Sequence, residues 1–335
     1  MIRSSPRLRR NARQTNASAD KTPPSAAHLE TPLVRYTQRM NRVLDHIDAH
    51  LDDSLEIAPL AAVANFSPYH FHRIFSAWMG ETLGDYLSRR RLEIAAIRLA
   101  GQRQTPILHI ALAVGFGSGE AFSRAFKARF GCTPSAWRAQ TPERWGEELL
   151  QARRKSNPDQ AGNALTGDNT GSTTHPEPAM QVTLATLPPT RIAYLRHIGP
   201  YGESVARFWQ NEFLPWMFAN DLGNRDCYGI GHNDPHIGDP AQFRYDACVE
   251  VPESFVPSGL AGLATLPGGR YAQLRYRGDG PGIGRAWAEL LRNWLPQSGL
   301  QIDSRPLFEH YPAGSDYDPQ TGIFTCQLCI PVRPL

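Results

Sequence analysis

Two stretches of the chain that lie far apart are nearly identical. LATLPPTRIAYLRHIG occupies residues 184–199 and LATLPGGRYAQLRYRG occupies residues 263–278, and the two agree at ten of sixteen positions. Similar segments at a fixed spacing are the sequence signature of a repeated structural unit. The second half of the chain is therefore expected to contain one unit twice.

A second repeat lies in the first half of the chain. A shift of 51 residues aligns eight identical pairs: Val63/Val114, Ser67/Ser118, Phe71/Phe122, Arg73/Arg124, Phe75/Phe126, Ala77/Ala128, Gly80/Gly131 and Thr82/Thr133. Each copy predicts a short helix, a tight turn and a second helix whose phenylalanines face inward. That arrangement is the sequence form of a helix-turn-helix.

Composition divides the chain between these repeats. Residues 153–180 are rich in Ser, Thr, Gly, Asn, Asp and Pro and nearly lack large apolar residues, and a flexible linker is predicted at 143–178. Residues 1–35 are predicted to be a disordered basic arm. An all-α domain with two helix-turn-helix units is expected at 36–142, and an α+β domain at 179–335.

Charge distinguishes the two halves. Residues 1–35 and 36–145 carry net charges of +5 and +3, whereas residues 146–180 and 181–335 carry −2 and −3. Only the front half is therefore expected to meet a polyanion such as DNA.

Several classes of protein are excluded by what the sequence lacks. No apolar run approaches the roughly 20 residues of a membrane span, and no secretory signal is visible. Five scattered cysteines favour a reducing compartment, and a cytoplasmic location is expected. Cys326 and Cys329 alternate along a strand and should point to opposite faces. No metal site, cofactor or catalytic motif is predicted.

The exposed faces of the second helices are the candidate DNA-reading surfaces, because the second helix of such a unit enters the major groove. Arginines at matching positions in both copies suit guanine or phosphate. The candidate DNA-binding residues are Tyr69, His72 and Arg73 in the first unit and Ser118, Glu120, Ser123, Arg124 and Lys127 in the second.

The back half alternates strand and helix patterns. Each copy of the repeat is predicted to be strand, helix, strand, strand, so two copies would give an α+β domain with a pseudo-twofold axis. A groove between duplicated units is a natural place for a small ligand.

Glu309 is the candidate ligand-binding carboxylate. It stands between Leu307 and Tyr311 on one face of a strand that has few charges. A buried carboxylate is costly unless it is paired, so Glu309 is exposed, satisfied by a protein group, or met by a bound cation. A structural or rim role is the alternative. Aromatic walls for a cation could come from Trp209, Trp216, Tyr245 and Tyr311.

The front half resembles a known family. GFGSGEAFSRAFKARFGCTPSAWR (115–138) resembles the signature segment of AraC-type transcription regulators, and SPYHFHRIFSAWMGETLGDYLSRRRLEIA (67–95) resembles the first half of the same domain. The resemblance implies seven helices, with two recognition helices that are joined by a long helix and address successive major-groove segments. Gly119 departs from the larger polar residue that is common at its position.

The back half resembles the gyrase-inhibitor-like small-molecule-binding domain. The landmarks are RHIGPYGE (196–203), YDACVEV (245–251) and FEHYP (308–312). The resemblance implies that Glu309 meets cationic, aromatic ligands. The order of the two domains resembles the Rob subgroup of AraC-type proteins.

These observations predict a sequence-specific DNA-binding transcription regulator whose back domain senses a small hydrophobic cation. Its expected partners are double-stranded DNA, RNA polymerase and a small-molecule effector, without a membrane. Two alternatives stay open for the back domain. It could be a hydrolase-like enzyme that uses Glu309 with Tyr245 or Tyr311 as an acid–base pair, or a protein-interaction module. The operator, the effector, activation versus repression, and oligomeric state are not determined.

Overall fold

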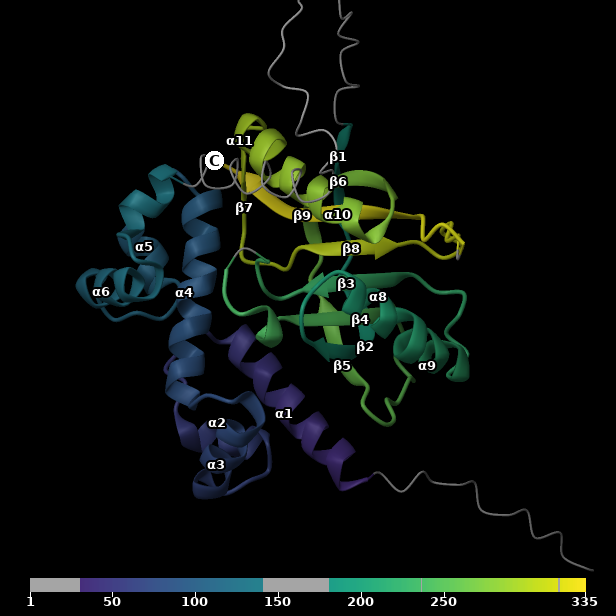
Figure 1. The fold of residues 1–335 in the computed structure, drawn as a ribbon, viewed down its shortest axis with the longest axis horizontal. Coiled ribbons are helices and arrows are strands. Elements are labelled where there is room, and N and C mark those ends of the chain that lie inside the picture. Colours follow the sequence, from purple (N-terminus) through teal and green to yellow (C-terminus); the bar gives the residue numbers. More distant parts are fainter. Residues whose placement is uncertain (1–30, 141–180, 236, 319) are drawn as a thin grey trace, which may run out of the picture.

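The computed structural model describes residues 31–140, 181–235, 237–318 and 320–335, which form a helical part and a part built on a sheet (Figure 1). The predicted linker at 143–178 and most of the predicted arm lie outside the described residues. In the described part of the chain, no helix is long and apolar enough to cross a membrane.

The helical part is organised around one long helix. Its elements include α1 (Pro32–Ala49), α2 (Ile57–Val63), α3 (Pro68–Met79), α4 (Leu83–Gly101), α5 (Ile107–Leu112) and α6 (Gly119–Phe130), and residues 134–140 are also helical. The pair α2–α3 packs at one end of α4 and the pair α5–α6 at the other (Figure 1). The first helix begins four residues before the predicted domain boundary, because Thr31 caps its first turn and Pro32 suits the first helical position.

The repeat in the helical part marks the ends of α3 and α6. Ser67 and Ser118 are their N-caps, and each side-chain oxygen accepts a backbone N–H three residues later. Gly80 and Gly131 end the same helices with φ of 73° and 75°, a conformation that glycine adopts without strain. The paired phenylalanines are fully buried, as the spacing predicts.

The second part is a curled antiparallel sheet with helices. Its elements are β1 (Val182–Leu187), β2 (Thr190–Ile198), α8 (Glu203–Phe208), η2 (Trp209–Phe213), α9 (Leu214–Ala219), β3 (Cys227–Gly231), η3 (Pro240–Gln242), β4 (Arg244–Glu250), β5 (Gly262–Leu266), β6 (Gly269–Gly278), α10 (Gly280–Glu289), η4 (Leu290–Trp294), α11 (Leu295–Gln297), β7 (Leu300–Ile302), β8 (Phe308–Tyr311) and β9 (Phe324–Pro334). The strand order is β1-β6-β9-β8-β3-β4-β2-β5, and β7 pairs with β9.

This order reads alike from both edges. From one edge the strands run β1, β6, β9, β8, and from the other they run β5, β2, β4, β3. Exchanging β1 with β5, β2 with β6, β4 with β9 and β3 with β8 maps the order onto itself. A duplicated unit predicts this pattern.

The predicted content of each unit requires a correction. The sixteen-residue repeat is two strands rather than one, with breaks at residues 188–189 and 267–268. The breaks are Pro-Pro and Pro-Gly, which favour turns and interrupt ladder hydrogen bonding. Each unit is therefore strand, strand, helix, strand, strand, and the second unit adds β7. The first strand of each unit pairs with the other unit, β1 with β6 and β5 with β2.

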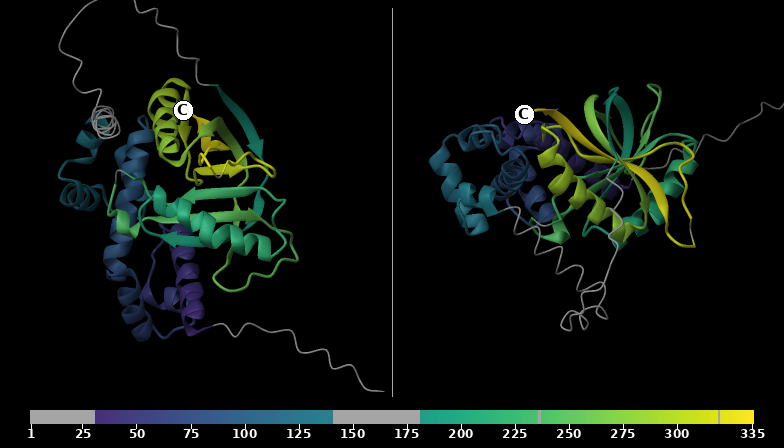
Figure 2. Two further views of the ribbon diagram at one scale, coloured as in Figure 1. Left: turned by 45° about the vertical axis from the view of Figure 1, so that its right-hand side comes forward. Right: turned by 90° about the horizontal axis from the view of Figure 1, so that it is seen from above.

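Two helical segments, α8–η2–α9 and α10–η4–α11, cover the same face of the sheet (Figure 2). Each of these two segments contains one π-helical turn, η2 or η4. Directly after the turn comes a Leu-Pro pair, Leu214-Pro215 or Leu295-Pro296. Proline lacks the N–H for the regular helical bond, and a π turn absorbs that defect. The two faces have separate cores, and Cys326 and Cys329 lie in different ones, as predicted.

Candidate functional site

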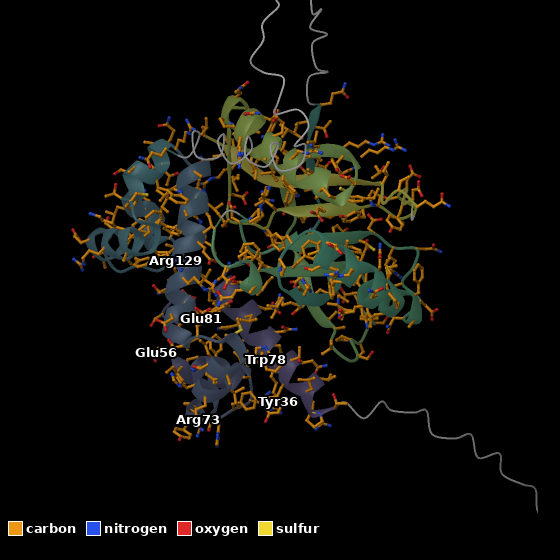
Figure 3. The ribbon with its side chains drawn as sticks, viewed as in Figure 1. Tyr36, Glu56, Arg73, Trp78, Glu81 and Arg129 are labelled. Carbon is orange, nitrogen blue, oxygen red and sulfur yellow. The ribbon has the colours of Figure 1, made fainter. Side chains whose placement is uncertain are left out.

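The first candidate DNA-reading surface is the outer face of α3. Phe71 and Phe75 are buried, which leaves Tyr69, His72 and Arg73 exposed as the spacing predicts. The guanidinium of Arg73 lies 6.0 Å from the Tyr69 ring centroid, close enough for a cation–π contact. Figure 3 shows Arg73 at the outer end of the helical part.

The second candidate surface is α6, where the predicted residues separate into two groups. Glu120, Arg124 and Lys127 are exposed, whereas Ser118 and Ser123 are half-buried. The Ser118 side chain is occupied as the N-cap of the helix, with its oxygen 3.1 Å from the Ala121 nitrogen.

A side chain at Gly119 would affect the helix before α6. A Cβ at this position would lie 3.4 Å from Leu108 on α5. That distance is close to ordinary van der Waals contact with the end of a flexible side chain, so the position does not require glycine.

The candidate effector site is centred on Glu309 in β8, where the two units of the sheet meet. Tyr245 and Tyr311 donate hydrogen bonds to one carboxylate oxygen at 2.7 and 2.9 Å. The indole of Trp287 donates to the other oxygen at 3.4 Å. Trp209 in turn donates to the Tyr245 hydroxyl at 3.2 Å. Both helical segments and both units therefore contribute to one hydrogen-bonded group.

This group holds a carboxylate without a counter-charge. Burial raises the pKa of Glu309 above its ordinary value, and the hydrogen bonds from Tyr245, Tyr311 and Trp287 partly oppose that rise. Burial and the neighbouring carboxylate raise the pKa of both tyrosines well above the usual range, so these hydroxyls keep their protons. In the described part of the chain, no ion pair reaches Glu309.

The structure changes the predicted set of aromatic residues. Trp216 does not join Glu309 but packs against Phe213 and Phe255 between the helices and the sheet. Trp287 was not predicted as a site residue. The repeat could have indicated it, because Trp287 lies in the helical segment of the second unit and the corresponding segment of the first unit carries Trp209.

Two cavities lie away from Glu309. One of about 440 Å³ is lined by Pro32, Arg35, Tyr36 and Arg39 of α1. Another of about 420 Å³ lies between the helical part and the sheet, with Arg98, His109 and Arg333 among its lining residues. Neither is lined by Glu309 or by its hydrogen-bonding partners.

Two family models match the chain in succession. A helix-turn-helix domain model matches residues 60–140. A GyrI-like small molecule binding domain model matches residues 180–333. The first begins within α2 and runs past the end of α6, and the second covers the sheet with its helices.

Similar proteins combine or share these parts. The transcriptional regulator Rob of Salmonella typhimurium is 26% identical over 297 residues, which are 86% of this chain and 95% of the relative. The right origin-binding protein of Escherichia coli K12 is 27% identical over 299 residues, with the same shares. The regulatory protein SoxS of Escherichia coli K12 is 39% identical over 92 residues, 28% of this chain and 85% of the relative. The chain therefore belongs to the AraC-type DNA-binding transcription regulators, with a GyrI-like small-molecule-binding domain as its second part.

Proposed function

We propose that the protein reads a specific DNA sequence with α3 and α6 and senses a hydrophobic cation at Glu309. The ligand assignment rests on the surroundings of the Glu309 carboxylate. It is held by three neutral donors at the meeting line of the two units, and in the described part of the chain no ion pair reaches it. A bound cation would supply the missing charge, and the surrounding rings would stabilise it further.

The DNA assignment rests on two exposed helices with matching arginines. Arg73→Ala and Arg124→Ala are each expected to weaken binding by about 1–3 kcal/mol if the arginines contact base edges. The probe is a duplex selected from a random library by the unmodified protein, and the assay is a gel shift. Arg207→Ala, an exposed arginine on α8, is the control. Equal losses on selected and random duplexes would show that these arginines hold only phosphates.

The ligand assignment is tested with two probes of similar shape, tetraphenylphosphonium and neutral triphenylphosphine oxide. Glu309→Gln should reduce affinity for the cation and leave affinity for the neutral compound nearly unchanged in calorimetry. Glu289→Gln removes an exposed carboxylate from α10 and serves as the control. Equal losses for both probes would mean that Glu309 has a structural role, and no loss would place it outside the ligand site.

The pH dependence gives a second check. The ionised form of Glu309 binds the cation, so affinity should fall as the pH drops through its raised pKa. Glu309→Gln should remove this dependence. The enzyme alternative would instead be favoured if the unmodified protein hydrolysed p-nitrophenyl acetate and Glu309→Gln did not.

A further inference from the structure

The loop between β3 and β4 lies against the helical part of the protein. Ile237 from this loop is 3% exposed and belongs to the same apolar cluster as Leu92, Ala96 and Phe122. That cluster is the core of the second helix-turn-helix unit. A side chain of the effector domain thus completes the core that supports α6.

The loop backbone also approaches α4 closely. Gly238 has a φ of 99°, and a Cβ there would lie 3.0 Å from the Glu93 carboxylate. The carbonyl of His232 accepts a hydrogen bond from Arg90 at 3.0 Å, and the Asn233 amide donates to Glu93 at 3.3 Å. Polar contacts of the loop therefore reach the middle of α4, between the two helix-turn-helix units.

A network of charges surrounds this contact. Arg244 pairs with Asp48 of α1 at 2.7 Å, and Arg90 of α4 pairs with the same carboxylate at 3.3 Å. Arg196 bridges Asp45 of α1 and Asp246 of β4 at 2.8 and 2.7 Å. The arginines are almost fully buried. Buried charges lose much of their stabilisation when a partner moves away, so this contact has a defined geometry.

The two strands that flank this loop, β3 and β4, pair with each other and form a hairpin. The strands of this β3–β4 hairpin support the candidate effector site. Tyr245 lies between Arg244 and Asp246 on β4, and neighbouring residues of a strand point to opposite faces. Tyr245 therefore contacts Glu309 on the helix-covered face. On the opposite face, Arg244 contacts Asp48 of α1 and Asp246 contacts Arg196 of β2. On β3, a Cβ at Gly229 would lie 2.5 Å from the Glu309 carboxylate. A ligand that moves Glu309 or Tyr245 would move this hairpin.

We propose that the β3–β4 hairpin is a positioning element for DNA recognition. Its loop holds the second helix-turn-helix unit in place relative to the first, and a ligand at Glu309 acts on DNA binding through it. The first half of this proposal needs only the helical part to bind DNA, and the second half rests on the proposed ligand site.

The first test measures spacing selectivity. One duplex is selected from a random library by the unmodified protein, and footprinting locates the two segments of this duplex that the protein protects. A second duplex carries one extra base pair between these two segments. The ratio of the two affinities does not depend on the fraction of folded protein. Ile237→Ser should reduce this ratio several-fold, because α6 is no longer held in one place. Ile198→Ser, the same change at an exposed position on β2, should leave it unchanged.

Asn233→Ala removes the hydrogen bond to Glu93 and the one that the Asn233 side chain accepts from the Arg244 backbone, without opening the apolar core. It should also lower the ratio. It decides the matter if Ile237→Ser does not fold by circular dichroism. An unchanged ratio in folded variants would overturn the proposal, as would an unmodified protein that binds both duplexes equally.

The second test adds tetraphenylphosphonium, with binding followed by tryptophan fluorescence. The cation should change the ratio for the unmodified protein. It should bind Ile237→Ser but leave its ratio unchanged. Binding without any effect on the unmodified protein would overturn the coupling. Failure to bind at all would refute the proposed ligand instead, while the spacing comparison would still decide the role of the loop.

Discussion

Replacing Asp48 by asparagine should weaken the contact between the two parts of the protein. The Asp48 carboxylate lies 2.7 Å from Arg244 and 3.3 Å from Arg90. Arg90 keeps Glu93 as a second partner, but Arg244 pairs with no other carboxylate in the described residues. One Arg244 nitrogen is already buried and has no hydrogen-bond partner among the described residues. Asp48→Asn would therefore leave a buried guanidinium without its counter-charge.

The expected loss is about 3 kcal/mol of unfolding free energy. Removing one member of a buried ion pair costs roughly 3–5 kcal/mol. The lower end of this range applies because the Asp48 side chain is 21% exposed, so water can reach the amide that replaces the carboxylate. Since folded proteins are stable by only about 5–15 kcal/mol, such a loss is easily measured.

Urea unfolding at pH 7, followed by circular dichroism, measures this loss. The control is Glu203→Gln, which breaks an exposed pair with Arg207 at 3.1 Å. That pair should contribute less than about 1 kcal/mol, and added salt should remove its contribution. The effect of Asp48→Asn should persist in salt. Equal effects of the two substitutions would refute the view that the buried network stabilises the docked arrangement.

Three further outcomes are expected. Burial opposes ionisation of Asp48 and Asp246, but neighbouring arginines hold the pKa of each carboxyl well below its ordinary value. The stability that these ionised carboxylates contribute is therefore present above about pH 4 and is lost as the pH falls. The urea midpoint should fall in acid, and it should fall less in Asp48→Asn. Gly229→Ala should place a methyl group 2.0 Å from the Tyr245 hydroxyl, cost about 1–3 kcal/mol of unfolding free energy and abolish cation binding in calorimetry. Gly231→Ala, whose Cβ would lie 3.3 Å from the Tyr201 hydroxyl, should cost less and keep cation binding, and equal behaviour of the two variants would contradict the site geometry. Ser118→Ala should cost about 0.5–2 kcal/mol in thermal unfolding as a lost N-cap, and a loss of DNA affinity beyond the unfolded fraction would show that Ser118 contacts DNA.

The sequence predicted features that depend on local pattern. Serine before α3 and α6, glycine after them and phenylalanines at helical spacing specify these two helices from within a few residues of each position. Glu309 was singled out because a lone carboxylate in a strand with few charges is visible without knowing its neighbours, and its role in ligand binding stays a prediction.

Features that depend on distant parts of the chain were not predicted. Each copy of the repeat was predicted as a single strand, but it forms two consecutive strands, β1 and β2 or β5 and β6, which do not pair with each other. The similarity between the copies runs across both strands, so the repeat alone does not mark the Pro-Pro and Pro-Gly breaks. Trp287 meets Glu309 only after the second helical segment folds onto the sheet. Asp48 and Arg244 are 196 residues apart, and neither has a local pattern that marks it as an interface residue.

The exchange of first strands between the two units has a consequence for synthesis of the chain. When Val182–Leu187 leaves the ribosome, its pairing strand, Gly269–Gly278, has not yet been made. Similarly, Thr190–Ile198 waits for Gly262–Leu266 before both of its edges are covered. The first unit therefore cannot complete its part of the sheet alone, and unpaired strand edges invite association with other chains. A break between β4 and β5 would leave two fragments that can each complete the sheet only by binding the other.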